Sequence, residues 1–84
     1  MIISYPCVFY YDDESDTYTA AIHDLELFAE GKTVEEAFAR AKEVLTTYLK
    51  YAKKYDEEVA EPTPFEVVKK ESKNIVCLVD VDVV

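Results

Sequence analysis

Apolar residues recur every three or four positions through residues 34–55, which is the spacing of an amphipathic helix. The apolar stripe consists of Val34, Ala37, Phe38, Ala41, Val44, Leu45, Tyr48, Leu49, Ala52 and Tyr55. Thr33 and Glu36 form the T-x-x-E pattern of a capping box where this stripe begins. The pattern therefore predicts one long helix over residues 34–55, with its stripe packed against the rest of the fold.

Shorter runs of alternating apolar residues predict four strands, over residues 2–11, 17–22, 25–30 and 75–84. The charged run 12–16 is short enough to be the turn of an antiparallel hairpin between the first two strands. Residues 56–63 are acidic and lead into Pro64, so we predict a connection there. Residues 65–70 are expected to add at most one helical turn.

The order of these elements, β-β-β-α-β, indicates a single α+β domain over residues 1–84. A helix between a hairpin sheet and a final strand is typical of a crossover connection. We therefore place the last strand beside the first and parallel to it. This arrangement gives a mixed four-stranded sheet of order 3-2-1-4 with a right-handed connection.

One long helix covers only one face of such a sheet, yet the first and last strands carry apolar residues on both faces. The second face would be an exposed apolar patch unless another molecule covers it. We therefore predict self-association, as a dimer or a higher oligomer, through a surface that includes Val8, Tyr10, Val76 and Leu78.

The composition is that of a small folded domain: 84 residues, half of them hydrophobic, with a single glycine. No apolar run is long enough for a transmembrane helix, and the N-terminus lacks the basic start of a signal peptide. Cys7 and Cys77 have no metal-binding spacing and are expected to be reduced thiols. These features predict a cytoplasmic protein.

The net charge is strongly negative, because 18 acidic residues against 9 basic ones leave −9. Direct binding of nucleic acid needs a basic surface, so this chain is not expected to bind nucleic acid itself. The acidity either keeps a small protein soluble or complements a basic partner. Composition alone favours the first explanation.

Few residues suggest catalysis or metal binding. The run 12–16 resembles the start of a calcium loop but lacks the glycine and the closing glutamate of such a site. His23 has no serine or cysteine arrangement around it that would use it as a general base. Asp80 and Asp82 could hold a hard cation as a residual nuclease, although charges that protect an edge strand are commoner. We therefore predict a protein that is not an enzyme, with no catalytic residue, cofactor or metal.

Four segments, in this order and spacing, resemble the HicB-like antitoxins. Residues 5–12 match the family's Y-P-x-x-x-x-Y-D, and residues 18–25 match a second strand that ends in P-D-L-P-G. Residues 28–37 match F-x-E-G-x-T-x-E-E-A, and residues 41–45 match A-K-E-x-L in the following helix. The resemblance covers nearly the whole chain.

The chain departs from the family pattern in two places. The residues His-Asp-Leu-Glu-Leu at 23–27 stand where the family has Pro-Asp-Leu-Pro-Gly, so no proline or glycine specifies the turn there. The family's C-terminal ribbon-helix-helix or helix-turn-helix segment is not found before Val84. Repression by operator binding is therefore not expected of this chain.

The resemblance implies a degenerate ribonuclease-H-like fold without nuclease activity. It also implies a role as an antitoxin that binds and masks a small basic RNA-cleaving toxin of the HicA type. The negative charge independently suits such a partner, because a protein that binds RNA presents a cationic surface. The alternative is an orphan HicB-like homo-oligomeric module, structural or regulatory, with no toxin partner.

The acidic residues at the chain reversals are the candidate toxin-binding surface. They are Asp12, Asp13, Glu14, Asp16, Asp24, Glu30 and Glu35. The family match supports Asp24, Glu30 and Glu35 in particular. A simpler explanation competes with this one, because turns are polar where they are solvated and the helix dipole alone favours Glu35.

Overall fold

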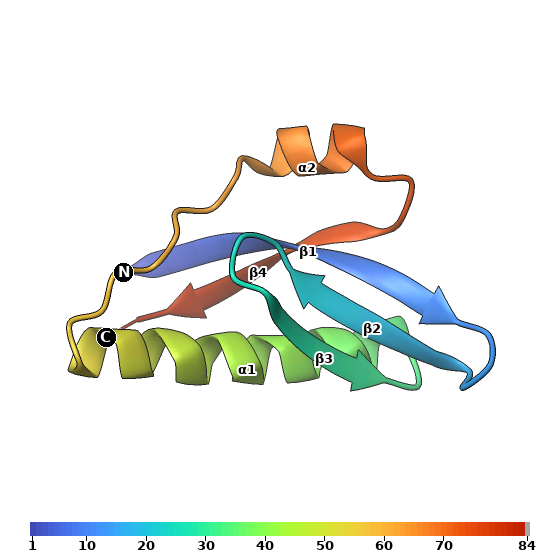
Figure 1. Cartoon of the computed structure of the whole chain (residues 1–84), viewed down its shortest axis with the longest axis horizontal. Helices are drawn as coiled ribbons and strands as arrows, with labels where there is room; N and C mark the ends of the chain where they lie inside the picture. Colours follow the sequence, from blue (N-terminus) through green and yellow to red (C-terminus); the bar gives the residue numbers. More distant parts are fainter. Residues whose placement is uncertain (84) are drawn as a thin grey trace.

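The computed structural model describes residues 1–83 as a four-stranded sheet with two helices (Figure 1). The elements are β1 (Ile2–Asp12), β2 (Thr17–Ile22), β3 (Leu27–Gly31), α1 (Val34–Lys54), α2 (Phe65–Glu71) and β4 (Val76–Asp82). The sheet has the order β3-β2-β1-β4. The predicted α+β class and strand order are therefore confirmed. The predicted last strand extended to Val84, which lies outside the described residues.

The predicted direction of the last strand is wrong, because β4 runs antiparallel to β1 and every strand pair in the sheet is antiparallel. A helix between two strands gives a parallel pair only when the chain returns directly to the sheet. Here the chain after α1 crosses to the other face and runs along the sheet as α2 (Figure 1). It therefore enters β4 from the opposite end.

The long helix α1 forms where the apolar stripe predicted it. The Thr33 side chain accepts a hydrogen bond from the Glu36 backbone N–H at 3.0 Å, which caps the first turn. Tyr55 caps the last turn through its own N–H. The stripe packs against one face of the sheet, and the core consists of Tyr5, Cys7, Phe9, Ala20, Ile22, Ala29, Ala37, Ala41, Leu45, Leu49, Val79 and Val81.

The strand β1 is shared between two partners along its length. Its residues from Ile2 to Val8 pair with β4, and those from Cys7 to Asp12 pair with β2. Pro6 lies where pairing with β2 ends, and its carbonyl accepts from the His23 N–H at 2.9 Å. A proline is tolerated at this point because the ladder needs no further N–H on that side.

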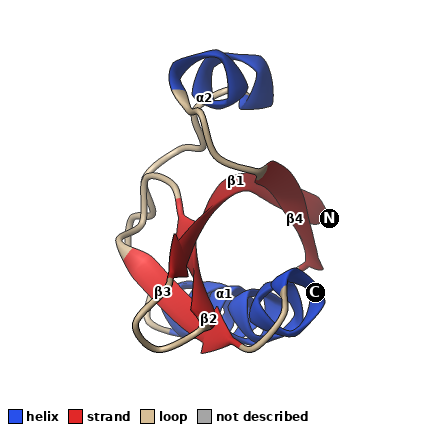
Figure 2. Cartoon of the chain, turned by 90° about the vertical axis from the view of Figure 1, so that its right-hand side faces the viewer, coloured by secondary structure: helices blue, strands red, loops and turns tan. Residues whose placement is uncertain are grey.

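The short helix α2 lies on the face of the sheet opposite α1 (Figure 2). Val68 of α2 and Val8 of β1 are only 3% and 5% exposed, so the prediction that this face is uncovered is wrong at Val8. The sequence contained little indication that α2 covers this face, because only one α2 residue, Val68, is buried. Tyr10 and Leu78 of the same face remain 50% and 42% exposed, and Val76 is half-buried.

No helix in residues 1–83 has the length and apolar character that crossing a membrane would require.

Candidate functional site

One end of the molecule gathers acidic side chains from two chain reversals. The β1–β2 turn and the β3–α1 junction lie at the same end of the sheet (Figure 1). The strand register agrees, since Asp12 pairs with Thr17 and Gly31 pairs with the next residue of β2, Tyr18. We call this surface the acidic end; it comprises Asp12, Asp13, Glu14, Asp16, Glu30 and Glu35, all exposed.

The β1–β2 turn is held by its own side chains. The Asp12 carboxylate accepts from the Glu14 backbone N–H at 3.0 Å, and the Tyr11 hydroxyl donates to Asp16 at 2.6 Å. Asp16 adopts a left-handed backbone with a φ of 53°. The hydrogen bond to Asp16 raises the pKa of the Tyr11 hydroxyl. The turn therefore presents its carboxylates in a defined arrangement.

The carboxylates of the acidic end form no ion pair with the rest of residues 1–83. The nearby Arg40 is engaged elsewhere, because its guanidinium contacts the Glu36 carboxylate at 3.1 Å and the Glu30 carbonyl oxygen at 3.0 Å. The negative charge of this surface is therefore available to an external cation.

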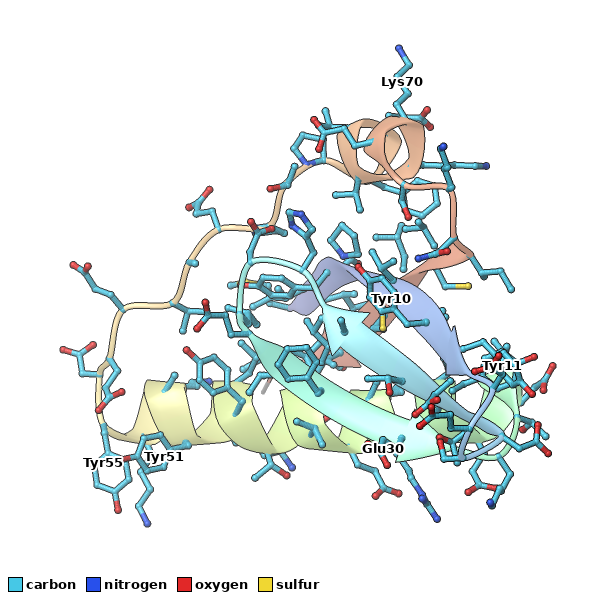
Figure 3. The ribbon with its side chains drawn as sticks, turned by 45° about the vertical axis from the view of Figure 1, so that its right-hand side comes forward. Tyr10, Tyr11, Glu30, Tyr51, Tyr55 and Lys70 are labelled. Carbon is cyan, nitrogen blue, oxygen red and sulfur yellow. The ribbon has the colours of Figure 1, made fainter. Side chains whose placement is uncertain are left out.

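Three exposed aromatic side chains lie between the acidic end and the middle of the sheet. Tyr10, Tyr11 and Phe28 are 50%, 54% and 63% exposed. Tyr11 lies among the acidic side chains of the hairpin, and Tyr10 lies nearer the middle of the sheet (Figure 3). In the register Phe28 is opposite Ala21, and Tyr10 is opposite Thr19. Tyr10 and Phe28 thus flank two small residues of β2 on the face opposite α1.

Sequence reasoning missed Phe28 and Tyr11 as candidate contact residues. The alternation in β3 carried the signal for Phe28, because its neighbours Leu27 and Ala29 pack toward the core and leave it on the other face. An aromatic group beside a charged rim is typical of protein interfaces.

Asp24 lies apart from the acidic end, in the β2–β3 turn. Its carboxylate accepts from the Thr63 backbone N–H at 2.6 Å and from the Thr63 hydroxyl at 2.9 Å. The His23 Nδ1 lies 3.0 Å from the same carboxylate. Burial opposes ionisation of Asp24, but the contacts from His23 and Thr63 outweigh it and hold the pKa of this carboxyl below its ordinary value.

The Asp24–Thr63 contact fastens the connection before α2 to the β2–β3 turn. This turn forms without the family's proline and glycine by placing Asp24 and Glu26 at positive φ, 77° and 54°. The structure thus gives Asp24 a function within the chain, and the toxin contact predicted for it remains a prediction.

Residues with catalytic potential are dispersed or already engaged. Asp80 pairs with the Ser4 hydroxyl, and Asp82 pairs with the N-terminal amine at 3.1 Å. No group of three or more His, Cys, Asp or Glu side chains in the described part of the chain is arranged to hold a metal ion. Cys7 and Cys77 are free thiols that lie opposite each other in the β1–β4 register. Burial, and to a lesser extent the neighbouring Cys77, raises the pKa of the Cys7 thiol to about 12.

A protein-family model described as the HicB-like antitoxin of bacterial toxin–antitoxin systems matches residues 5–84. The chain belongs to the HicB-like antitoxin family. The sequence resemblance is thereby confirmed, and the motif residues around Tyr5, Gly31 and Leu45 lie inside the matched range. A search of curated proteins finds no significant match.

Solved structures show the same HicB-like fold. The N-terminal domain of the Burkholderia pseudomallei antitoxin HicB superposes with a TM-score of 0.82 at 19% identity, covering 96% of this chain and 100% of that domain. The B. pseudomallei antitoxin HicB gives 0.81 at 20% identity, covering 95% of this chain and 64% of the other. A toxin–antitoxin complex from Streptococcus pneumoniae gives 0.78 at 23% identity, covering 98% and 70%.

Proposed function

We propose that this HicB-like protein binds and masks a small basic RNA-cleaving toxin of the HicA type, and that it does so without catalysis. The observation that carries the proposal is the acidic end, whose carboxylates have no cationic partner within residues 1–83. Membership of an antitoxin family supports it, as does the likeness of its fold to a chain of a toxin–antitoxin complex. The masking would take place in the cytoplasm, where such a toxin meets its RNA.

The masking mechanism follows from the charges. A toxin that binds RNA needs a cationic surface, and the acidic end competes with RNA for that surface. The net charge of −9 speeds the encounter with a basic protein. The exposed aromatic groups Tyr10, Tyr11 and Phe28 then supply apolar contact area, which sets how slowly the complex dissociates.

The alternative function is a homo-oligomeric module with no toxin partner. The exposed apolar residues Leu78 and Ile75 favour self-association, since they are 42% and 53% exposed on or beside an edge strand. Self-association is also compatible with toxin binding, because β4 lies at the other edge of the sheet from β3 and its acidic junction. We therefore propose that the protein forms at least a dimer.

The experiment compares two variants with the same change of net charge. In the first, Asp12→Asn, Asp13→Asn and Glu14→Gln neutralise the β1–β2 turn. In the control, Asp56→Asn, Glu57→Gln and Glu58→Gln neutralise exposed carboxylates just after α1, at the opposite end of the molecule (Figure 1). The probe is a basic HicA-type protein, taken from the gene beside this chain where one is encoded there, and its association is followed by stopped flow at several salt concentrations.

The turn variant is expected to associate roughly three- to tenfold more slowly at low salt, with a weaker salt dependence and a smaller change in dissociation. The control should stay much closer to the unmodified protein. Equal effects of the two variants would reduce the role of the acidic end to general net charge. If no basic protein is encoded nearby and none co-purifies from the host, the module without a toxin partner becomes the better account.

A further inference from the structure

We propose that the free edge of β4 pairs antiparallel with β4 of a second copy and joins two sheets into one. This inference rests on the self-association proposed above and assigns its surface. The sequence pattern predicted that two copies associate through one face of the sheet. Here backbone hydrogen bonds between the edges of two strands join them instead.

The backbone of β4 has one bonded side and one free side. Phe9 N–H donates to the Ile75 carbonyl at 3.0 Å, and Val83 N–H donates to the Met1 carbonyl at 2.8 Å. These bonds show that the backbone N–H and C=O groups of the odd-numbered residues in this segment point toward β1. Alternation along an antiparallel ladder then directs the N–H and C=O groups of Val76, Leu78 and Asp80 away from the sheet. Such a row of groups is a template for another strand.

The other edge of the sheet is less available. β3 has five residues, and its outward Glu30 carbonyl already accepts from Arg40 at 3.0 Å. β4 has seven residues, and no bond from the described residues occupies its outward backbone groups. β3 and β4 form opposite edges of the curved sheet (Figure 2). β4 is thus the edge with open backbone groups, and its protective charges, Asp80 and Asp82, are confined to its last residues.

The charge pattern along this segment is complementary to itself in the antiparallel direction. Lys73 precedes the strand, its middle is apolar, and its end carries Asp80 and Asp82, which stay exposed beside their contacts with Ser4 and the N-terminal amine. An antiparallel second copy sets the basic start of one strand beside the acidic end of the other. A parallel arrangement would instead align like charges, which is destabilising. This polarity favours a second copy as the occupant.

One register fits these features best. With Leu78 opposite Leu78 of the second copy, Val76 lies opposite Asp80, and Asp82 lies opposite Asn74 of the second copy. The aspartates of the two copies then stay well apart. The Leu78 side chains, each 42% exposed in the isolated chain, would cover one another at the centre of the new ladder. A register centred on Asp80 would oppose two carboxylates and is excluded by their repulsion.

The first test compares Leu78→Lys with Phe28→Lys by sedimentation equilibrium of the full chain. Both substitutions place a lysine at an exposed apolar position on an edge strand, on the same face of the sheet. Leu78→Lys opposes two lysines at the centre and should weaken the dimer on the order of tenfold or more, whereas Phe28→Lys should leave it intact. Circular dichroism confirms that each variant is folded.

The second test uses charge. Lys73→Glu should weaken the dimer roughly two- to tenfold, and the matched Lys32→Glu, with the same change of net charge, should have little effect. Adding Asp82→Lys to Lys73→Glu restores opposite charges and should recover association. This recovery distinguishes a local contact from a general effect of acidity.

Amide hydrogen exchange measures directly whether the outward N–H groups of β4 are hydrogen-bonded in the dimer. The N–H groups of Leu78 and Asp80 should be protected at protein concentrations that favour the dimer and exchange rapidly on dilution. A dimer that leaves both amides unprotected, or that responds to Phe28→Lys and not to Leu78→Lys, would overturn the edge pairing while preserving self-association. A monomer at all concentrations would overturn both, and neither result bears on toxin binding.

Discussion

At the scale of single residues, Gly31 sets how closely α1 approaches the sheet. A Cβ placed on Gly31 would meet the Ala37 backbone nitrogen and would come within 2.9 Å of the Glu36 carbonyl carbon. Backbone atoms cannot move aside as a flexible side chain can. The glycine of the family's E-G-x-T motif is therefore required by space and not by an unusual φ, since Gly31 has no positive φ.

We expect Gly31→Ala to lower the free energy of unfolding by about 1–3 kcal/mol, because the added methyl group forces α1 away from β3. Urea denaturation followed by circular dichroism measures the change. The neighbouring Lys32→Ala is the control, since Lys32 is exposed and its loss should stay within about 0.5 kcal/mol. Equal midpoints for the two variants would contradict the close contact.

Asp24 provides a pH-dependent contribution to stability. Its pKa is lower in the folded protein than the ordinary 3.8, so the ionised form stabilises the fold above that pH. This contribution is lost as the pH falls below 3.8 through the folded pKa. Asp24→Asn should therefore cost about 1–2 kcal/mol at pH 7, through the hydrogen bonds with Thr63, and progressively less in acid.

The measurement is urea denaturation at a series of pH values from neutral to acidic. Asp13→Asn is the matched control, because Asp13 is an exposed carboxylate in the other turn. Its difference from the unmodified protein should be small at every pH. A cost for Asp24→Asn that does not change with pH would show that the charge of Asp24 contributes nothing.

At the scale of elements, α1 is the part of the fold that its residue pattern specifies most completely. Leu45 is fully buried, whereas Tyr51 on the same helix is 52% exposed. Leu45→Ala should cost about 2–5 kcal/mol, the range for a core truncation that leaves a cavity. Tyr51→Ala should cost at most about 1 kcal/mol, since it loses little beyond a contact with Tyr55. Denaturant midpoints of the two variants compare the two faces of the helix directly.

The remaining elements differ in how well their sequence patterns predict them. β2 was predicted at its observed bounds because alternation and a charged turn both mark it. α2 has seven residues and buries only Val68, so its pattern predicted at most one helical turn and gave no sign of the sheet face that it covers. The direction of β4 depends on that helix, because α2 carries the chain along the sheet before β4 begins. The sequence predicted at most one helical turn over residues 65–70, and the course of that segment along the sheet, which the sequence did not show, reversed the direction of β4.

At the scale of the whole molecule, the fold determines which acidic residues lie together on one surface. The turn after β1 and the junction before α1 are distant in sequence and meet only because β2 and β3 reverse the chain between them. Asp24 looks equivalent in the sequence but lies apart, where Thr63 engages it. Composition leaves a basic partner as one of two explanations for the net charge, whereas the grouping of the carboxylates on one surface depends on topology.

Because β1 pairs with both β2 and β4, its two halves find their partner strands at different times during synthesis. β1 is synthesised before the other strands, but its residues from Ile2 to Tyr5 pair only with β4, which follows both helices. During synthesis this half of β1 remains an open edge, and closing so long a loop is slow. A chain interrupted after α1 would therefore expose an unpaired edge to proteases and to aggregation. Interrupted translation would thus yield a fragment that is degraded, and the amount of folded protein would follow the number of chains carried through β4.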